Sequence, residues 1–188
     1  IDALIKTERE IQCKDGMTLD EVQEIVTLPK FDARTQRNQL DPNAVEIPPT
    51  VAAQLRQYVE AIACTYRDNP FHNFEHASHV TMSVSKLLSR IAAPDIELEG
   101  INDDAAANLH DHTYGITSDP LTQFACIFAA LIHDVDHPGV PNGQLITEKA
   151  SIAAAYKDKS IAEQNSVDLA WDLLMDDTFF DLRRCIYK

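Results

Sequence analysis

Closely spaced histidines are the residues of this sequence best suited to chemistry. Five of the seven histidines fall in two short clusters. The first cluster, residues 71–80 (FHNFEHASHV), contains His72, His76 and His79 at intervals of four and three residues. A helix would place all three imidazoles near one face. Because an imidazole can bind a metal or transfer a proton near neutral pH, this spacing predicts a metal-binding or acid–base site.

The second cluster, residues 133–139 (HDVDHPG), joins imidazoles to carboxylates. A strongly apolar helix predicted over 120–132 would bring His133 and Asp134 to its C-terminal end. A mixed set of nitrogen and oxygen ligands suits zinc, or a harder ion such as magnesium or manganese. One carboxylate can bridge two ions roughly 3.5–4 Å apart, an arrangement that supports in-line phosphoryl displacement. Burying these side chains without a cation would be costly.

Ordinary structural roles are also compatible with some of these side chains. A lone buried histidine is more often a hydrogen-bonded core residue than a ligand, and we expect His79 to orient a ligand or to pack in the core. A second His-Asp dipeptide, His110 and Asp111, lies in the polar stretch 108–119 and is interpreted as part of a solvated loop. For Glu163, helix capping and a catalytic role are equally compatible with the spacing.

The periodicity of the apolar residues predicts helices and no strands, hence an all-α fold. The predicted helices cover 18–27, 51–66, 74–91, 120–132, 144–156 and 161–175, and a further helix begins at 178. We expect residues 94–119 to be mostly loop. We also expect Thr50 to cap the helix that follows it, and Ser160 and Glu163 to form a capping box.

The helix predicted over 74–91 is expected to turn one face toward the core. We assign this face to its apolar residues, which are Val80, Val84, Leu87, Leu88 and Ile91. His76 lies in helical register with Val80 and Leu87, which predicts that its imidazole turns toward the core.

The composition is that of a globular protein with an acidic surface. Hydrophobic residues make up 45% of the 188 residues, and the formal net charge is −14. A field of this sign repels phosphate backbones, so we expect no nucleic-acid partner, and divalent cations would be needed to reverse the sign at a site for an anionic substrate. The four scattered cysteines predict buried or free thiols in a reducing compartment, and the longest apolar run, 124–132, is too short to cross a bilayer. We therefore expect a cytoplasmic segment without membrane contact.

The two histidine clusters resemble the signatures of a known enzyme family. Residues 69–80 and 133–142 are similar to the two histidine motifs of class I 3′,5′-cyclic nucleotide phosphodiesterases, and residues 162–174 (AEQNSVDLAWDLL) resemble the helix that follows. The resemblance implies the multi-helix fold of HD-type phosphohydrolases and cyclic nucleotide phosphodiesterases. It also implies a lead-in over 1–48 and, over 49–188, the N-terminal part of a catalytic domain that is incomplete at its C-terminus.

The same resemblance implies a role for each candidate site residue. His72 would be the general acid that protonates the leaving 3′ oxygen. His76, His133 and Asp134 would hold a first metal, expected to be Zn²⁺, and Asp134 would bridge to a second, expected to be Mg²⁺ or Mn²⁺. Supporting positions around these ligands are implied for Asn73, His137 and Glu163. The family's fourth ligand is a downstream aspartate outside the 188 residues, so we expect this segment alone to bind metal weakly and to hydrolyse little.

Several residues depart from the family's usual pattern. Phe71 stands where tyrosine is usual, which removes a hydroxyl, and His79 stands in place of an aspartate. Residues 164–166 (QNS) replace a run that usually contains a histidine, and residues 94–119 resemble an insertion. These differences indicate a divergent member in which the implied acid and metal ligands are intact.

The resemblance implies hydrolysis of 3′,5′-cyclic nucleotides, cyclic AMP or cyclic GMP or both, to 5′ monophosphates in second-messenger signalling. Two alternatives stay open. One is another HD-type nucleotide phosphohydrolase, against which the HNxxHA pattern of residues 72–77 argues. The other is a catalytically silent regulatory or dimerisation module of the same fold. The expected partners are the cyclic nucleotide and, through the full-length protein, a second copy of the chain.

Overall fold

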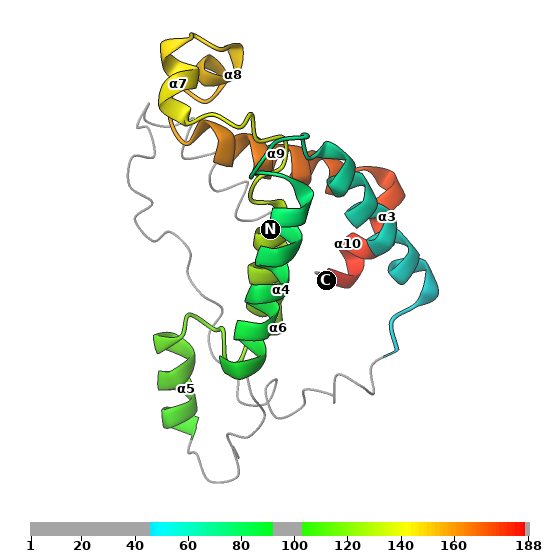
Figure 1. The fold of residues 1–188 in the computed structure, drawn as a ribbon. Coiled ribbons are helices and arrows are strands. Elements are labelled where there is room, and N and C mark those ends of the chain that lie inside the picture. Colours follow the sequence, from blue (N-terminus) through cyan, green and yellow to red (C-terminus); the bar gives the residue numbers. More distant parts are fainter. Residues whose placement is uncertain (1–45, 92–102, 187–188) are drawn as a thin grey trace, which may run out of the picture. The chain divides into compact units, whose positions relative to one another are not determined.

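The computed structural model describes residues 46–91 and 103–186 (Figure 1). Within these two ranges every regular element is a helix, which confirms the all-α prediction for this part of the chain. All the described residues belong to one compact unit.

Some predictions concern residues outside the described ranges. The helix expected over 18–27 lies there, as does most of the connector before residue 49. The boundary at residue 48 between a lead-in and a catalytic segment stays a prediction. Among the described helices, none combines the length and the apolarity needed to span a membrane.

Helix α3 (Pro49–Thr65) starts slightly earlier than predicted. Pro49 occupies the first helical position, where its fixed φ suits the helix and its missing N–H would have had no helical partner. The N-cap residue is Pro48 and no side chain caps this end, so the prediction that Thr50 caps the helix is wrong. The buried positions of α3 are Val51, Tyr58 and Ile62.

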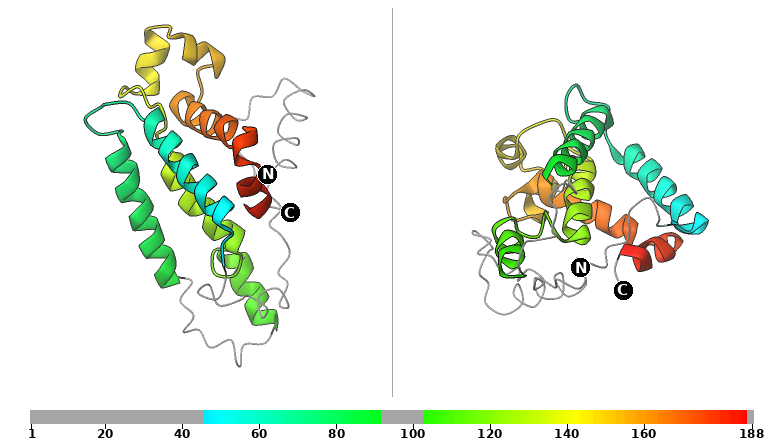
Figure 2. Two further views of the ribbon diagram at one scale, coloured as in Figure 1. Left: turned by 90° about the vertical axis from the view of Figure 1, so that its right-hand side faces the viewer. Right: turned by 90° about the horizontal axis from the view of Figure 1, so that it is seen from below.

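Helices α4 (Phe74–Ile91) and α6 (Pro120–Ile132) form the most extensive helix pair in the described part of the chain, and their bounds confirm those predicted. His76 near the start of α4 approaches Asp134 just beyond the end of α6, so the two helices run antiparallel (Figure 2). This arrangement brings the two histidine clusters to the same end of the helix pair.

The buried face of α4 agrees with the predicted one at Leu88 and differs from it at Leu87 and Ile91. Ala77 and Leu88 are buried, whereas Leu87 is 57% exposed and Ile91 is 39% exposed. Successive helical residues are turned by about 100°, so Leu87 points away when Leu88 is buried. His76 is therefore not aligned with a buried stripe through Leu87. It lies instead at the edge of the buried face, next to Ala77.

Helix α5 (Asp103–His112) occupies a stretch that we expected to be mostly loop. His110 is only 4% exposed, and its Nδ1 lies 2.6 Å from Ser118 Oγ. The interpretation of His110 and Asp111 as a solvated loop is therefore wrong, because both lie in a helix and His110 is buried, although Asp111 is exposed. A polar stretch can fold here because the buried imidazole is hydrogen-bonded within the turn that leads to Asp119, the N-cap of α6.

A single helix expected over 144–156 is in fact two short helices, α7 (Asn142–Thr147) and α8 (Ser151–Ala155). Lys149 between them has a φ of +52°, in the left-handed region, which a continuous right-handed helix cannot contain. These helices lie at the end of the described fold opposite α5 (Figures 1 and 2). They share a small buried cluster with the start of the next helix, formed by Leu145, Ala153 and Ile161.

Helix α9 (Ile161–Leu174) begins without the predicted capping box. Ser160 has a φ of +37° and its side chain makes no capping hydrogen bond, so this prediction is wrong. The backbone N–H of Ala162 donates instead to Asn142 Oδ1 at 3.1 Å. The start of α9 is therefore tied to the start of α7.

The segment after α9 contains the 3₁₀-helix η2 (Asp177–Phe179) and helix α10 (Phe180–Ile186), in place of one helix from 178. Both elements pack on α3. The hydroxyl of the fully buried Tyr58 donates to the Ala170 carbonyl oxygen at 2.8 Å and so links α3 to α9. The buried members of this main core are Val51, Tyr58, Ile62, Ile132, Val135, Ala170, Leu174, Phe179 and Leu182.

Candidate metal centre

The two histidine clusters meet where α4 begins and α6 ends. Asp134 Oδ2 lies 3.1 Å from His133 Nε2 and 3.8 Å from His76 Nε2. The side chain of Asp134 is 12% exposed, whereas those of His76 and His133 are 26% and 35% exposed. The three groups therefore converge at a half-buried position that solvent can still reach.

The hydrogen bonding of His133 leaves its Nε2 free to bind a cation. Nδ1 of this ring lies 2.9 Å from the carbonyl oxygen of Ala130, and a carbonyl oxygen can only accept, so Nδ1 carries the proton. In the neutral ring, Nε2 then turns a lone pair toward Asp134 Oδ2. Two acceptors 3.1 Å apart repel each other unless a proton or a metal ion lies between them. The donor set and its orientation thus fit a divalent cation.

Asp134 belongs to two candidate ligand sets. In the first, one ligand atom from each of His76, His133 and Asp134 lies within 4.8 Å of the others. In the second, the same holds for His72, Asp134 and His137. A carboxylate shared between two sets can bridge two ions. The fold therefore brings together the three residues expected to hold the first metal, with His72 and His137 beside them.

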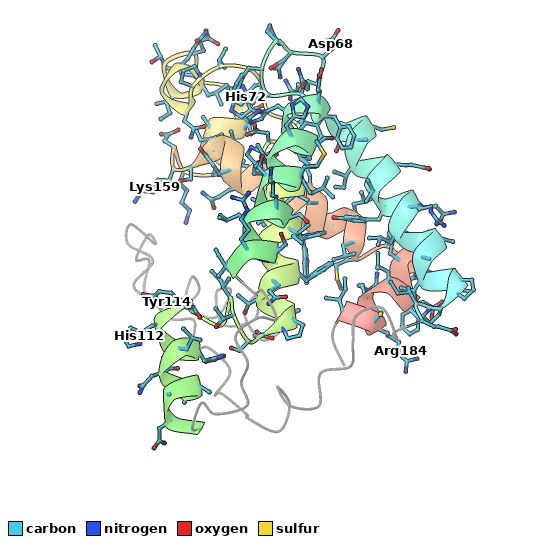
Figure 3. All side chains as sticks on the ribbon, turned by 60° about the horizontal axis from the view of Figure 1, so that its bottom comes forward. Asp68, His72, His112, Tyr114, Lys159 and Arg184 are labelled. Carbon is cyan, nitrogen blue, oxygen red and sulfur yellow. The ribbon has the colours of Figure 1, made fainter. Side chains whose placement is uncertain are left out.

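His72 and His137 lie face to face beside Asp134; Figure 3 labels His72. Their rings stack with centroids 3.8 Å apart and an interplanar angle of 18°. Burial and the nearby charge of His72 lower the pKa of His137, which favours the neutral ring. Nδ1 of that ring accepts a hydrogen bond from the Gly139 N–H at 3.0 Å, so its proton is on Nε2. A neutral His137 therefore offers Nε2–H as a hydrogen-bond donor rather than a lone pair to a metal.

Asn73 and Glu163 are each fixed by side-chain hydrogen bonds. Asn73 Oδ1 accepts from the backbone N–H of His76 at 2.9 Å, and its Nδ2 donates to the carbonyl oxygen of Asn69 at 2.9 Å. Glu163 Oε2 accepts from Asn142 Nδ2 at 2.9 Å. Asn73 thus orients the backbone that carries His76, and Asn142 fixes the direction of the Glu163 carboxylate.

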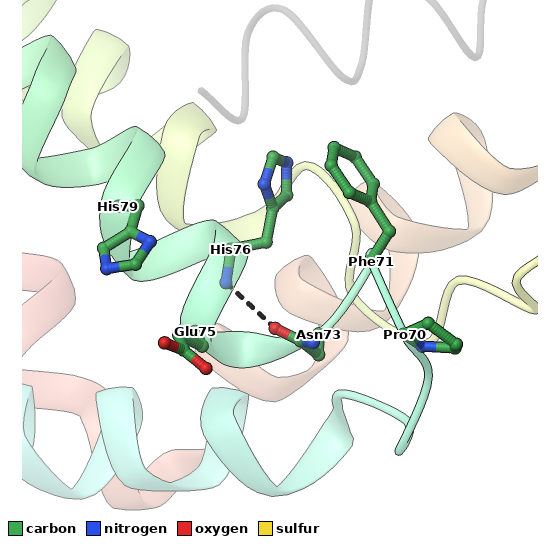
Figure 4. Close-up of a pocket in the computed structure, with 6 residues that line it drawn as sticks. All are labelled: Pro70, Phe71, Asn73, Glu75, His76 and His79. Atoms are coloured by element: carbon green, nitrogen blue, oxygen red, sulfur yellow. Dashed lines mark hydrogen bonds between the residues drawn. The ribbon is translucent and has the colours of Figure 1, made fainter.

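His79 lies outside both candidate ligand sets. Its side chain is exposed, so the expectation that it packs in the core is wrong. Phe71 is 61% exposed, and its ring lies beside that of His76 with centroids 4.4 Å apart. An open pocket of about 230 Å³ adjoins these rings and is lined by Pro70, Phe71, Asn73, Glu75, His76 and His79 (Figure 4).

A salt bridge that the sequence patterns did not reveal joins the two loops of the site. Arg67 Nε lies 2.6 Å from Asp136 Oδ1, and this hydrogen bond holds the pKa of Asp136 below its usual value. Asn69 Nδ2 donates to the carbonyl oxygen of His137 at 3.0 Å. Arg67 and Asn69 belong to a polar run directly before the first histidine cluster, which was the available sequence signal.

Asn165 and Ser166 of α9 contact the loop that carries Asp134. The Oγ of the fully buried Ser166 donates to the Val135 carbonyl oxygen at 2.7 Å. Asn165 Nδ2 lies 3.3 Å from Asp136 Oδ2. These two residues therefore tie α9 to the loop after α6.

Comparisons with known proteins identify the family. The family profile of 3′5′-cyclic nucleotide phosphodiesterases matches residues 71–184. Over 110 residues the chain is 36% identical to a 3′,5′-cyclic-AMP phosphodiesterase (isoform F) of Drosophila melanogaster, which covers 58% of the chain and 13% of the relative. Over 122 residues it is 29% identical to the cGMP-specific 3′,5′-cGMP phosphodiesterase 3 of Dictyostelium discoideum, which covers 65% of the chain and 22% of the relative. The chain thus spans less than a quarter of the length of either relative.

A solved structure shares the fold. The phosphodiesterase domain of the Salpingoeca rosetta rhodopsin phosphodiesterase matches with a TM-score of 0.51 and 24% sequence identity, covering 71% of this chain and 36% of that chain. The profile match extends over more than half of the 188 residues and includes both histidine clusters. The chain therefore belongs to the class I 3′,5′-cyclic nucleotide phosphodiesterase family.

Proposed function

We propose that the protein hydrolyses 3′,5′-cyclic nucleotides to 5′ monophosphates at a centre of two divalent metals. The observation that carries this proposal is the convergence of His76 Nε2, His133 Nε2 and the Asp134 carboxylate where α4 and α6 meet. Membership of the family supports the choice of substrate class. The related proteins named above act on cyclic AMP in one case and on cyclic GMP in the other, so both nucleotides are candidate substrates.

The donor atoms support a different metal in each position. Two imidazole nitrogens and a carboxylate from His76, His133 and Asp134 suit Zn²⁺. In the second set, His137 is a hydrogen-bond donor and not a metal ligand, and His72 is assigned to proton transfer below. The Asp134 carboxylate oxygen therefore remains as the protein ligand of the second metal. Oxygen ligands together with water suit Mg²⁺, or Mn²⁺ in its place.

The chemistry requires water to add to phosphorus while the bond from phosphorus to the 3′ oxygen breaks. Bound divalent cations would supply Lewis acidity, which polarises the phosphoryl group and lowers the pKa of water. The imidazolium of His72 gives its proton to the departing 3′ oxygen. His137 offers its Nε2–H to an oxygen in the site, and Asn142 holds the carboxylate of Glu163 in a fixed direction nearby.

Hydrolysis assays with cyclic AMP and cyclic GMP test this proposal, using the longest natural sequence that contains these residues. We expect 5′ monophosphate to form, a chelator to abolish its formation, and added zinc with magnesium to restore it. A folded, metal-loaded protein that hydrolyses neither nucleotide would show the proposal to be wrong. That result would favour a silent module of the same fold or a different phosphoester substrate.

A variant separates the role of His72 from metal binding. We expect His72→Gln to lower kcat by roughly 10²–10⁴-fold, because it removes the proton donor, while zinc affinity changes little. His112→Gln is the matched control, since His112 is exposed on α5. Equal activity of His72→Gln and the wild type would remove His72 from the mechanism.

We propose that this reaction takes place in the cytoplasm.

A further inference from the structure

A salt bridge outside the two ligand sets links the loops that carry them. Arg67 lies between α3 and α4, and Asp136 lies between α6 and α7. The contact is bidentate, with Nε 2.6 Å from Oδ1 and Nη2 3.0 Å from Oδ2. A planar guanidinium that binds both oxygens of a carboxylate fixes the orientation of the two groups as well as their separation.

The backbone at Asp136 depends on a tight turn. Its φ is +56°, in the left-handed region that few residues other than glycine adopt, although aspartate and asparagine tolerate it. The turn is closed by a hydrogen bond from the His137 N–H to the Asp134 carbonyl oxygen at 3.0 Å. The conformation of residue 136 therefore decides how Asp134 and His137 are placed relative to each other.

The Asp136 carboxylate connects three segments of the chain. Besides Arg67, it contacts Asn165 of α9, whose Nδ2 lies 3.3 Å from Oδ2. The same two loops are joined a second time, because Asn69 Nδ2 donates to the His137 carbonyl oxygen at 3.0 Å. Asn69 also lies 3.4 Å from the position that a side chain at Gly139 would occupy, so the two loops are closely packed.

We propose that Asp136 is a positioning residue of the metal centre: through Arg67 it sets the separation between the histidines at the start of α4, His72 and His76, and the ligands that follow α6. The inference rests on the proposed function, in that both clusters bind metal. The side chains of Arg67 and Asp136 are 49% and 31% exposed, and an ion pair so open to solvent stabilises a fold only slightly. Its loss should therefore affect metal affinity more than stability.

Two conservative variants test the proposal. Asp136→Asn retains the shape, one acceptor oxygen and a tolerance of the left-handed turn, but loses the bidentate ion pair. Arg67→Lys keeps the charge and loses the planar fork. The matched control is Asp181→Asn on α10, an exposed carboxylate that accepts from Gln54 Nε2 of another helix at 3.4 Å. Zinc affinity is measured by competition with a chromophoric chelator on the whole chain.

We expect Asp136→Asn and Arg67→Lys each to weaken zinc binding about tenfold or more, as is usual for residues that orient metal ligands. The double variant that combines Arg67→Lys with Asp136→Asn should bind zinc no more weakly than Asp136→Asn alone, because both substitutions remove the same interaction. Asp181→Asn should bind zinc as the wild type does. Zinc affinities within about twofold of wild type for both single variants would overturn the proposal.

Hydrogen exchange of the metal-free chain separates this inference from the proposed function. Asp136→Asn should speed backbone exchange over residues 133–139, whereas Asp181→Asn should not. If the wild type binds no zinc, the proposed function fails, and the exchange rates still show whether Asp136 holds the loop. Unchanged exchange over 133–139 in Asp136→Asn would overturn the positioning role, whatever the wild-type zinc affinity is.

Discussion

Replacing Asp134 with asparagine should weaken metal binding strongly while leaving the metal-free chain folded. The Asp134 carboxylate is common to both candidate ligand sets, so neutralising it removes one negative charge from both positions at once. The attraction between this charge and a divalent cation exceeds that of one pair of unit charges, which contributes about 4 kcal/mol at a separation of about 4 Å and an effective dielectric constant of about 20. At about 1.4 kcal/mol for each factor of ten, zinc affinity should fall by roughly 10²–10³-fold.

The stability of the metal-free chain should respond differently. In the wild type, Oδ2 of Asp134 lies 3.1 Å from His133 Nε2, which carries a lone pair in the neutral ring. The amide of Asp134→Asn can donate a hydrogen to that lone pair, so the free energy of unfolding without metal should stay within about 1 kcal/mol of wild type or rise. Metal binding and fold stability should therefore change independently.

Calorimetric titration of zinc into the chelator-stripped chain, without a polyhistidine tag, measures the affinity, and urea denaturation measures the stability. The other His-Asp dipeptide gives a matched control. Asp111→Asn makes the same chemical change in a dipeptide that precedes α6, separated from His133 by a helix roughly 20 Å long, and should not alter zinc affinity. Wild-type zinc affinity in Asp134→Asn would refute the assignment of this carboxylate as a shared ligand.

Two further predictions concern the fold that supports the site. Tyr58→Phe should lower the free energy of unfolding by about 1 kcal/mol in urea denaturation, because the buried Ala170 carbonyl oxygen loses the Tyr58 hydroxyl as a donor; an unchanged value would mean that this hydrogen bond contributes nothing. Ser160→Gly should raise the free energy of unfolding by up to about 1 kcal/mol, since glycine adopts a φ of +37° without steric cost; a decrease would argue that the Ser160 side chain stabilises the turn.

Local sequence patterns were sufficient to predict the helices that carry the site. The long apolar run after Asp119 predicted α6, although only Ala130 and Ile132 of this helix are buried, and the spacing of residues 74–91 predicted the bounds of α4. The sequence also placed His76, His133 and Asp134 at helix ends. Their convergence required the antiparallel pairing of α4 with α6, which was not evident from either segment alone.

Several predictions of local structure failed because the sequence pattern did not reveal the contact or backbone conformation that determines the structure. Asn142 caps α9 from another helix, so the local Ser160–Glu163 pattern was misleading. His110 is buried in a stretch whose polarity predicted solvent exposure, because Ser118 provides a hydrogen-bond partner. The division between α7 and α8 depends on one lysine with positive φ, which helix periodicity does not reveal.

No sequence pattern predicted the salt bridge between Arg67 and Asp136. Arg67 and Asp136 are 69 positions apart, and each lies in a loop without apolar periodicity. Only the folded arrangement of the two loops brings them together. Polar residues immediately adjacent to candidate metal ligands are therefore better treated as possible supports for those ligands than as simple helix ends.

X-ray absorption spectroscopy of the zinc-loaded chain measures the ligands of the proposed metal centre most directly. We expect nitrogen and oxygen neighbours at about 2.0–2.1 Å, with the outer-shell scattering of two imidazoles, from His76, His133 and Asp134. His133→Ala should remove one imidazole from that signal. Sulfur neighbours at about 2.3 Å, or a wild-type spectrum without imidazole scattering, would contradict a metal centre built from these residues.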